Sequence, residues 1–394
     1  MATIDDKTMK TGAGRVSMTT AATEPRVAAA PAPQPGIALC LSGGGYRAML
    51  FHAGTLWRLN ELGYLPRLDL VSSVSGGSIT AGALGIGWAG FAFDAAGVAT
   101  NFVDQLIVPV KDMAATSVDV EAVLLGHLPG IDGAKLVADA YRAHLFATHT
   151  LQDLPDRPRF VINATNMQSG VLWRFTKAYL WDWRVGEVAN PQTQLAVAVT
   201  ASSAFPPALA PVHLKLQDGD FVPGSGSDLQ RPPYTTAVIL ADGGIYDNMG
   251  LEPAWKRYDT ILVSDAGKAV APDPTPKTDP LSYTLRVIDV IQNQVHALRS
   301  RELIGSFKAH ERKGAYWGIG TAIAAYKVAN PLPCPPEKTA PLATYPTRLT
   351  AVPEDIQERL INWGYAVCDA AMRAYVDPGL PAPAGFPYPG QGVG

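Results

Sequence analysis

One serine in this chain has the surroundings of a nucleophile. The segment VSSVSGGS places Ser75 between a short apolar run and the pair Gly76-Gly77. This spacing matches the G-x-S-x-G elbow, except that Ser73 replaces the first glycine. Small residues on both sides of the serine allow a sharp turn from a strand into a helix, which exposes the hydroxyl at the positive end of that helix. The pattern predicts a nucleophilic Ser75, while a Gly/Ser-rich turn without chemistry stays open as the alternative.

A run of three glycines, Gly43, Gly44 and Gly45, follows the apolar segment IALCLS. Consecutive glycines cost a folded chain backbone entropy, so we expect a local requirement for them. Their N–H groups can point at an anion near the start of the following helix. Beside a serine elbow, the simplest such anion is the oxyanion of an acyl-transfer intermediate. Arg47 is a candidate source of further positive charge there, and pairing with a surface carboxylate is its alternative role.

A nucleotide-binding loop is the competing interpretation of these glycines. A dinucleotide fingerprint requires a glycine where Ala48 stands, and an acid at the end of the second strand, whereas Asp69 lies at its start. A P-loop requires a Gly-Lys-Ser/Thr sequence, which does not follow. We therefore favour the oxyanion interpretation over phosphate binding.

A serine nucleophile needs a base, and an aspartate is the best candidate. Asp242, in ILADGGIYDNMG, ends an apolar strand and precedes two glycines. Sites form at the carboxyl ends of parallel strands, and burial there would raise the affinity of the carboxylate for a proton. Asp265, in LVSDAG, occupies a comparable position and is the second candidate. None of the seven histidines lies in a Gly-flanked loop after a late apolar strand, but a histidine-dependent serine esterase stays open.

The elements that must position these groups alternate between strand and helix. Apolar runs predict strands at 37–42, 68–75, 159–166, 171–176, 237–242 and 260–265, and helices at 46–62, 193–205, 282–307 and 354–376. This alternation predicts an α/β domain with a largely parallel sheet. We expect a disordered leader at 1–35, a catalytic domain at 36–270, and a mostly helical extension at 271–394 that packs on the core.

Composition excludes several functional classes. The 394 residues carry a net charge of −3 and no dense Lys/Arg run, which argues against a nucleic-acid partner. Three scattered cysteines fit neither a disulfide framework nor a structural zinc site, and we expect no metal or cofactor. We see no apolar run long enough to cross a bilayer and no signal peptide. We therefore expect a cytoplasmic protein that contacts membranes only transiently, with leaderless secretion left open.

Four segments, in this order, together resemble the patatin-like phospholipase family. SGGGYR resembles its glycine-rich oxyanion block, SVSGG its serine elbow, TASSAFPP its Ala-Ser-x-Ala-x-Pro segment, and DGG the block that carries the aspartate of its Ser–Asp dyad. The resemblance covers residues 37–270. It implies a three-layer α/β/α fold and an enzyme that hydrolyses the carboxylic esters of phospholipids or other lipids.

The resemblance also assigns roles to residues. It implies that Ser75 attacks the ester carbonyl, that Asp242 accepts and returns the proton without a histidine, and that Gly43–Gly45 with Arg47 stabilise the oxyanion. The alternative is a catalytically silent member that only binds lipid. The substrate head group and acyl chain, the balance between hydrolase and acyltransferase, and the oligomeric state do not follow from these motifs.

Overall fold

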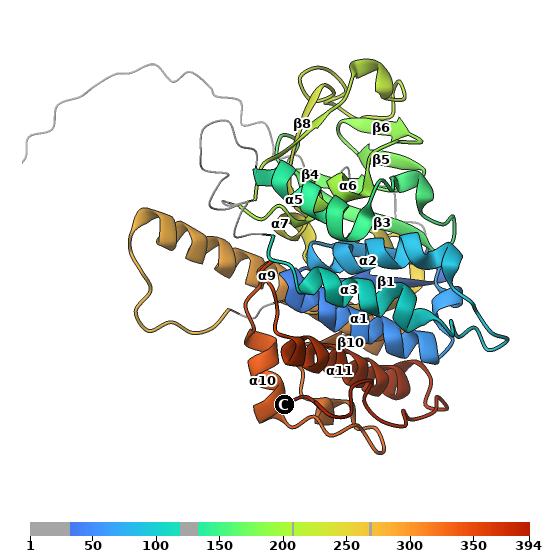
Figure 1. The fold of residues 1–394 in the computed structure, drawn as a ribbon. Helices are drawn as coiled ribbons and strands as arrows, with labels where there is room; N and C mark the ends of the chain where they lie inside the picture. The colour runs from blue at the N-terminus through green and yellow to red at the C-terminus, as the bar shows by residue number, and fades with distance from the viewer. Residues whose placement is uncertain (1–31, 119–132, 207–208, 268–269) are drawn as a thin grey trace, which may run out of the picture. The chain divides into compact units, whose positions relative to one another are not determined.

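A mixed sheet of ten strands organises the residues that the structure describes, 32–118, 133–206, 209–267 and 270–394 (Figure 1). In the computed structural model the strand order is β10-β9-β1-β2-β3-β4-β5-β6, and β8 pairs with both β3 and β7. The strands are β1 (Gln34–Leu41), β2 (Leu70–Val74), β3 (Arg159–Asn166), β4 (Val171–Phe175), β5 (Tyr179–Asp182), β6 (Gly186–Ala189), β7 (Val212–Lys215), β8 (Ala237–Asp242), β9 (Tyr258–Asp265) and β10 (Lys313–Gly318).

The five neighbouring strands from β10 to β3 are parallel, as predicted. Beyond them the pairings are antiparallel, from β3 outward to β6 and between β8 and its partners β3 and β7. The first strand begins at Gln34, three residues earlier than predicted, because Gln34 pairs with Tyr258 and donates to the Arg257 carbonyl oxygen at 2.7 Å. Most of the predicted leader, residues 1–31, lies outside the described residues.

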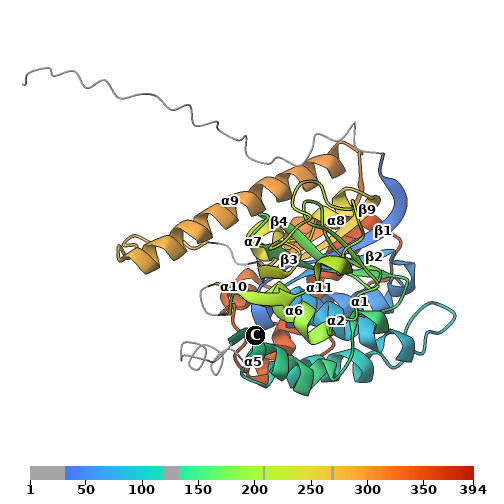
Figure 2. The same cartoon turned by 90° about the horizontal axis from the view of Figure 1, so that it is seen from above.

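Helices cover both faces of the sheet. The α-helices are α1 (Gly45–Glu61), α2 (Gly76–Gly87), α3 (Val108–Ala114), α5 (Gly133–Tyr141), α6 (Leu195–Ser203), α7 (Gly244–Asp247), α8 (Glu252–Trp255), α9 (Pro280–Lys308), α10 (Pro336–Thr344) and α11 (Glu354–Ala371). Figure 2 shows α8 and α9 on one side of the strands and α1 and α2 on the other. None of the helices in the described segments is both long and apolar enough to span a membrane.

Two apolar cores separate these three layers. Neighbouring residues of a strand point to opposite faces. Leu39 and Leu41 of β1 therefore join the larger core beneath α1 and α2, whereas Ala38 and Cys40 join a smaller core that includes Leu303 of α9. The result is the α/β/α layering that the family resemblance implied.

The segment after residue 270 is part of this architecture. Residues 33–394 form one compact unit, and β10 pairs with β9 along Lys313–Gly318. Helix α11 packs on α1, and Leu360, Trp363 and Val367 of its apolar stripe are fully buried. These side chains therefore face the protein core.

Candidate active site

Ser75 occupies a sharp turn between β2 and α2. Its backbone has φ 54° and ψ −124°, which is the left-handed strain expected of an elbow, and it is the N-cap residue of α2. The Ser75 N–H donates to the Ser202 hydroxyl at 2.9 Å, and Ser202 donates to the carbonyl oxygen of Asn163 at 2.7 Å. Helix α6 and β3 thus hold the strained turn in place.

Glycine is required directly after Ser75 because the glycine loop, Gly43–Gly45, passes against this position. A Cβ atom on Gly76 would lie 2.0 Å from the carbonyl oxygen of Gly45. The glycine loop and the serine elbow therefore touch through backbone atoms. This contact brings the two motifs that the sequence separates by 30 residues into one site.

Asp242 reaches the elbow because β2 and β8 share one edge of β3. Strand β2 pairs with β3 up to Val74, which lies opposite Asn163. Strand β8 pairs with the next stretch of β3, where Asp242 lies opposite Ala164. Since β8 is antiparallel to β3, its carboxyl end runs toward the carboxyl end of β2. Ser75 and Asp242 consequently come from strands whose carboxyl ends meet on one edge of β3, and β8 is antiparallel to β3 although the sequence predicted a largely parallel sheet.

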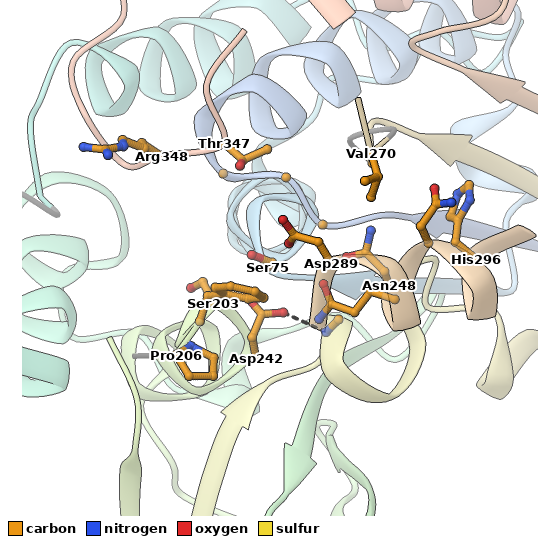
Figure 3. A pocket seen from close by; sticks show the side chains of 18 of the residues that line it. Ser75, Ser203, Pro206, Asp242, Asn248, Val270, Asp289, His296, Thr347 and Arg348 are labelled. Atoms are coloured by element: carbon orange, nitrogen blue, oxygen red, sulfur yellow. Dashed lines mark hydrogen bonds between the residues drawn. The ribbon is translucent and has the colours of Figure 1, made fainter. Parts of the chain in front are cut away.

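The carboxyl group of Asp242 is buried, and its pKa lies near neutral pH. Burial raises the pKa of Asp242 to about 7, against the opposing effects of the hydrogen bond from the Gly244 N–H and of the nearby Ser75 hydroxyl. The Gly244 N–H lies 2.7 Å from Oδ1 (Figure 3). A carboxylate with this proton affinity is suited to general base catalysis, because its pKa lies near the working pH.

The glycine loop offers two free amides beside this pair. All three glycines line the same cavity as Ser75 and Asp242, but the Gly43 N–H donates to the carbonyl oxygen of Asn248 at 3.0 Å. The N–H groups of Gly44 and Gly45 have no partner among the described residues. Gly45 has φ 60°, a conformation that favours glycine. Gly44 and Gly45 are therefore the candidate oxyanion donors, and Gly43, which the sequence also suggested, is not.

Arg47 differs from its predicted role. Its side chain is fully buried and donates to the carbonyl oxygens of Ala343 at 3.2 Å, Tyr345 at 2.8 Å and Ala266 at 2.7 Å. Burial lowers the pKa of Arg47 to about 10, so the guanidinium stays charged at neutral pH. Arg47 is not among the residues that line the cavity. It ties the glycine loop to two other segments instead of facing an oxyanion.

Asp265, the second candidate base, is engaged elsewhere. Its Oδ2 accepts hydrogen bonds from His296 and Tyr316, both at 2.5 Å. Burial acts to raise the pKa of Asp265, but the charge of His296 and these hydrogen bonds outweigh it and hold the pKa well below its usual range. A carboxylate stabilised in this way is a poor proton acceptor. Asp265 instead anchors α9 through His296.

The candidate groups open into one cavity of about 680 Å³. Apolar side chains of Phe205, Pro206, Leu209 and Leu349 line part of it, and polar side chains of α9 line another part. Among the histidines within the described ranges, His296 is the one that lines this cavity, and in Figure 3 it lies away from Ser75, beyond Asn248. Its Nε2 is committed to Asp265.

Comparison with known families assigns the chain to one of them. A model of the family described as "Patatin-like phospholipase" matches residues 39–255, which is more than half of the chain. The chain belongs to the patatin-like phospholipase family. The match includes the glycine loop, the elbow and Asp242, and a search of curated protein sequences gives no match.

Solved structures resemble this member of the patatin-like phospholipase family at low sequence identity. They include human GIVD cytosolic phospholipase A2 in complex with methyl gamma-linolenyl fluorophosphonate, at 14% identity and a TM-score of 0.47, over 85% of this chain and 57% of that one. VipD from Legionella pneumophila matches at 16% identity and a TM-score of 0.34, over 85% and 66%. The type III effector protein ExoU matches at 22% and 0.24, over 44% and 41%. The patatin-like chain thus spans less than two-thirds of the length of these proteins.

The sequence did not reveal every residue that shapes the site of this patatin-like protein. Ser202 lies in the segment TASSAFPP, which the family resemblance marked without giving Ser202 a role, and its hydroxyl holds the backbone of Ser75. Asn248 and His296 were not predicted to line the cavity. Asn248 closes the DGGIYDN segment, so its nearness to Asp242 was the available signal. No local pattern around His296 indicates its contact with Asp265.

Proposed function

We propose that this protein hydrolyses carboxylic esters of lipids through an acyl-enzyme intermediate. The observation that carries the proposal is that the Ser75 hydroxyl and the buried carboxyl of Asp242 line one cavity, close enough together for the hydroxyl to lower the pKa of the carboxyl. Membership of the patatin-like phospholipase family supports lipid esters as the substrate class. The apolar cavity wall supports the same class, because it suits an acyl chain.

In the first half-reaction the Ser75 Oγ attacks the ester carbonyl carbon while Asp242 takes the hydroxyl proton. The N–H groups of Gly44 and Gly45, at the start of α1, stabilise the negative charge on the carbonyl oxygen. The intermediate then collapses, the C–O bond to the alcohol breaks, and Asp242 returns the proton to the leaving oxygen. The products of this step are a free alcohol and an acyl group on Ser75.

In the second half-reaction water takes the place of the alcohol. Asp242 accepts a proton from water as its oxygen attacks the acyl carbon, and the same two amides stabilise the second oxyanion. Collapse releases the fatty acid and restores the Ser75 hydroxyl with the proton held by Asp242. One carboxyl group therefore serves as base and acid in both halves.

A fluorophosphonate probe tests this assignment directly. We expect the full chain to be labelled and Ser75→Ala to show no labelling. Asp242→Asn should be labelled at least about 100-fold more slowly, because general base catalysis contributes this much or more. Ser203→Ala removes another serine of the same cavity and should still be labelled. Labelling of Ser75→Ala, or an undiminished rate in Asp242→Asn, would refute the mechanism.

Product analysis tests the substrate class. Incubation of the wild-type chain with mixed lipids should release free fatty acid, and Ser75→Ala should release none. A silent lipid-binding module would release no fatty acid in either case. A histidine-dependent esterase would lose activity on His296→Asn and retain it on Asp242→Asn.

A further inference from the structure

Helix α9 presents a polar face to the candidate active site. The polar side chains that line the cavity from this helix recur at helical spacing and thus share one face. They are Arg286, Asp289, Gln292, Asn293 and His296. His296 anchors this face to Asp265, and Arg286 donates to the Ala271 carbonyl oxygen at 2.8 Å.

The opposite face of α9 is apolar and exposed. We call it the apolar face of α9 and define it as Tyr283, Val287, Val290, Ile291 and Leu298, whose exposed fractions lie between 41% and 53%. At 100° per residue these side chains point away from the cavity. Gln294 is the one polar residue among them. Between Pro280 and Leu298 the charged residues are Arg286 and Asp289, which both belong to the polar face.

This arrangement is the reverse of an ordinary surface helix. Such a helix turns its apolar stripe toward the core and its polar residues toward water. With Leu281, α9 carries six of the twelve large apolar side chains that are exposed among the described residues. Figures 1 and 2 both show its N-terminal half projecting beyond the sheet. An exposed apolar stripe of this length marks a surface that binds a partner.

We propose that the apolar face of α9 docks on a lipid bilayer and so holds the cavity, which the opposite face of the same helix lines, close to the membrane surface. The inference rests on the proposed function, since a lipid ester hydrolase must draw substrate from such a surface. The two faces of the same helix support it, because one lines the cavity while the other is free to enter the membrane interface. Phe205, which lines the cavity and is itself 38% exposed, adds a further apolar group at that site.

Apolar burial, not charge, drives this docking. The apolar face carries no charged residue, and the whole chain has a net charge of −3, so attraction to anionic lipid has no evident source. Interfacial helices bind through apolar area plus electrostatic attraction, and here the first contribution dominates. Binding to zwitterionic phosphatidylcholine vesicles should therefore match binding to vesicles with added anionic lipid and should change little with salt.

The test uses co-sedimentation of the full chain with phosphatidylcholine vesicles in a Ser75→Ala background, which prevents turnover. We expect Val290→Asp/Ile291→Asp to lower the vesicle partition coefficient at least about tenfold, because two charges replace two groups that enter the interface. Val108→Asp/Val222→Asp is the matched control, since both valines are exposed and neither lines the cavity. It should bind as the parent does. Thermal unfolding of each variant verifies folding.

Failure of this inference is distinguishable from failure of the proposed function. Equal binding by Val290→Asp/Ile291→Asp and its parent, or no binding by the parent, would overturn the docking inference. The alternative result is a dimer of the chain that the same double substitution dissociates without affecting vesicle binding. That result would assign the apolar face of α9 to a second copy of the chain and would also overturn the docking inference. Hydrolysis of a monomeric short-chain ester by the wild-type chain reports the proposed function independently of vesicles.

Discussion

At the scale of single residues, the electrostatics of Asp242 decide how the proposed chemistry works. A carboxylate in water is a weak base, but burial raises the pKa of Asp242 to about 7. The Gly244 N–H and the Ser75 hydroxyl lower the pKa only in part. Asp265 has the opposite surroundings, with a cation beside it, and remains charged. Two aspartates that end similar apolar strands therefore have pKa values shifted in opposite directions.

We predict that activity rises with pH through about 7. The proposed mechanism requires Asp242 as the charged base, and below its pKa the carboxyl is protonated. The value of kcat/KM for a monomeric ester should thus fall about tenfold per pH unit below about 7 and level off above it. A pH–rate profile of the wild-type chain measures this dependence. A midpoint near 4 would show that the base is an ordinary exposed carboxyl.

Thermal unfolding supplies the control for this assignment. The raised pKa means that the buried carboxyl favours the folded state below the pKa of the unfolded chain, about 4, and loses this contribution as pH rises to about 7. Asp242→Asn carries no charge at either pH. The variant should therefore unfold at a higher temperature than wild type at pH 8, and the gap should shrink as pH falls from 7 to 4.

The sequence was sufficient to single out the two candidate reacting residues, which line one cavity in the structure, but not all of their neighbours. The elbow around Ser75 and the strand end at Asp242 are local patterns, so both positions could be read from the chain. The partners of Arg47 could not, because the carbonyl groups of Ala343 and Tyr345 lie nearly 300 residues away. The role of Gly43 was also misjudged, since its N–H is bound by Asn248 from a distant loop.

At the scale of elements, the close pair of α1 and α11 depends on two glycines. A Cβ atom on Gly54 would lie 1.9 Å from the carbonyl oxygen of Ile361, and one on Gly364 would lie 1.9 Å from that of Phe51. The two helix backbones therefore touch at this crossing. Around it, Arg58 of α1 donates to Asp369 of α11 at 2.8 Å.

We predict that Gly54→Ala destabilises the protein by about 2 kcal/mol or more, because the methyl group forces the helices apart. Chemical denaturation of the purified variant measures the loss. Gly305→Ala is the control, since its added Cβ would meet nothing within 4 Å in α9. This control should be neutral or stabilising by up to about 1 kcal/mol. Equal stability of the two variants would contradict the contact between α1 and α11.

The positions of helices and strands were easier to predict than the pairing between strands. The apolar periodicities located α1, α9 and α11 to within a few residues, and the short apolar runs located β2, β8 and β9. The direction of β8 was not predicted, because a strand of six residues carries no local sign of whether its partner is parallel. The pairing between β8 and β3 comes from tertiary contacts alone.

At the scale of the whole molecule, we predict that a chain ending at residue 270 does not fold. The family match ends at residue 255, but removal of later residues would leave the edge of β9 unpaired and expose the face of α1 that α11 covers. Near-UV circular dichroism and a thermal melt of the fragment should show no cooperative transition. A fragment that melts cooperatively would show that residues 271–394 are a separable extension.

The carboxyl ends of β2 and β8 meet on one edge of β3, and this has a consequence for the order of folding. The turn of the serine elbow can begin to form locally, since β2 and α2 are adjacent in the sequence, before α6 and β3 fix its strained conformation. The dyad cannot, because β3 must receive one strand from early in the chain and another from far later before the hydroxyl and carboxyl meet. Under the proposed mechanism, reactivity toward a phosphonylating reagent is thus acquired late. During refolding or synthesis, this reactivity would show that long-range assembly is complete. Helix content alone would not show it.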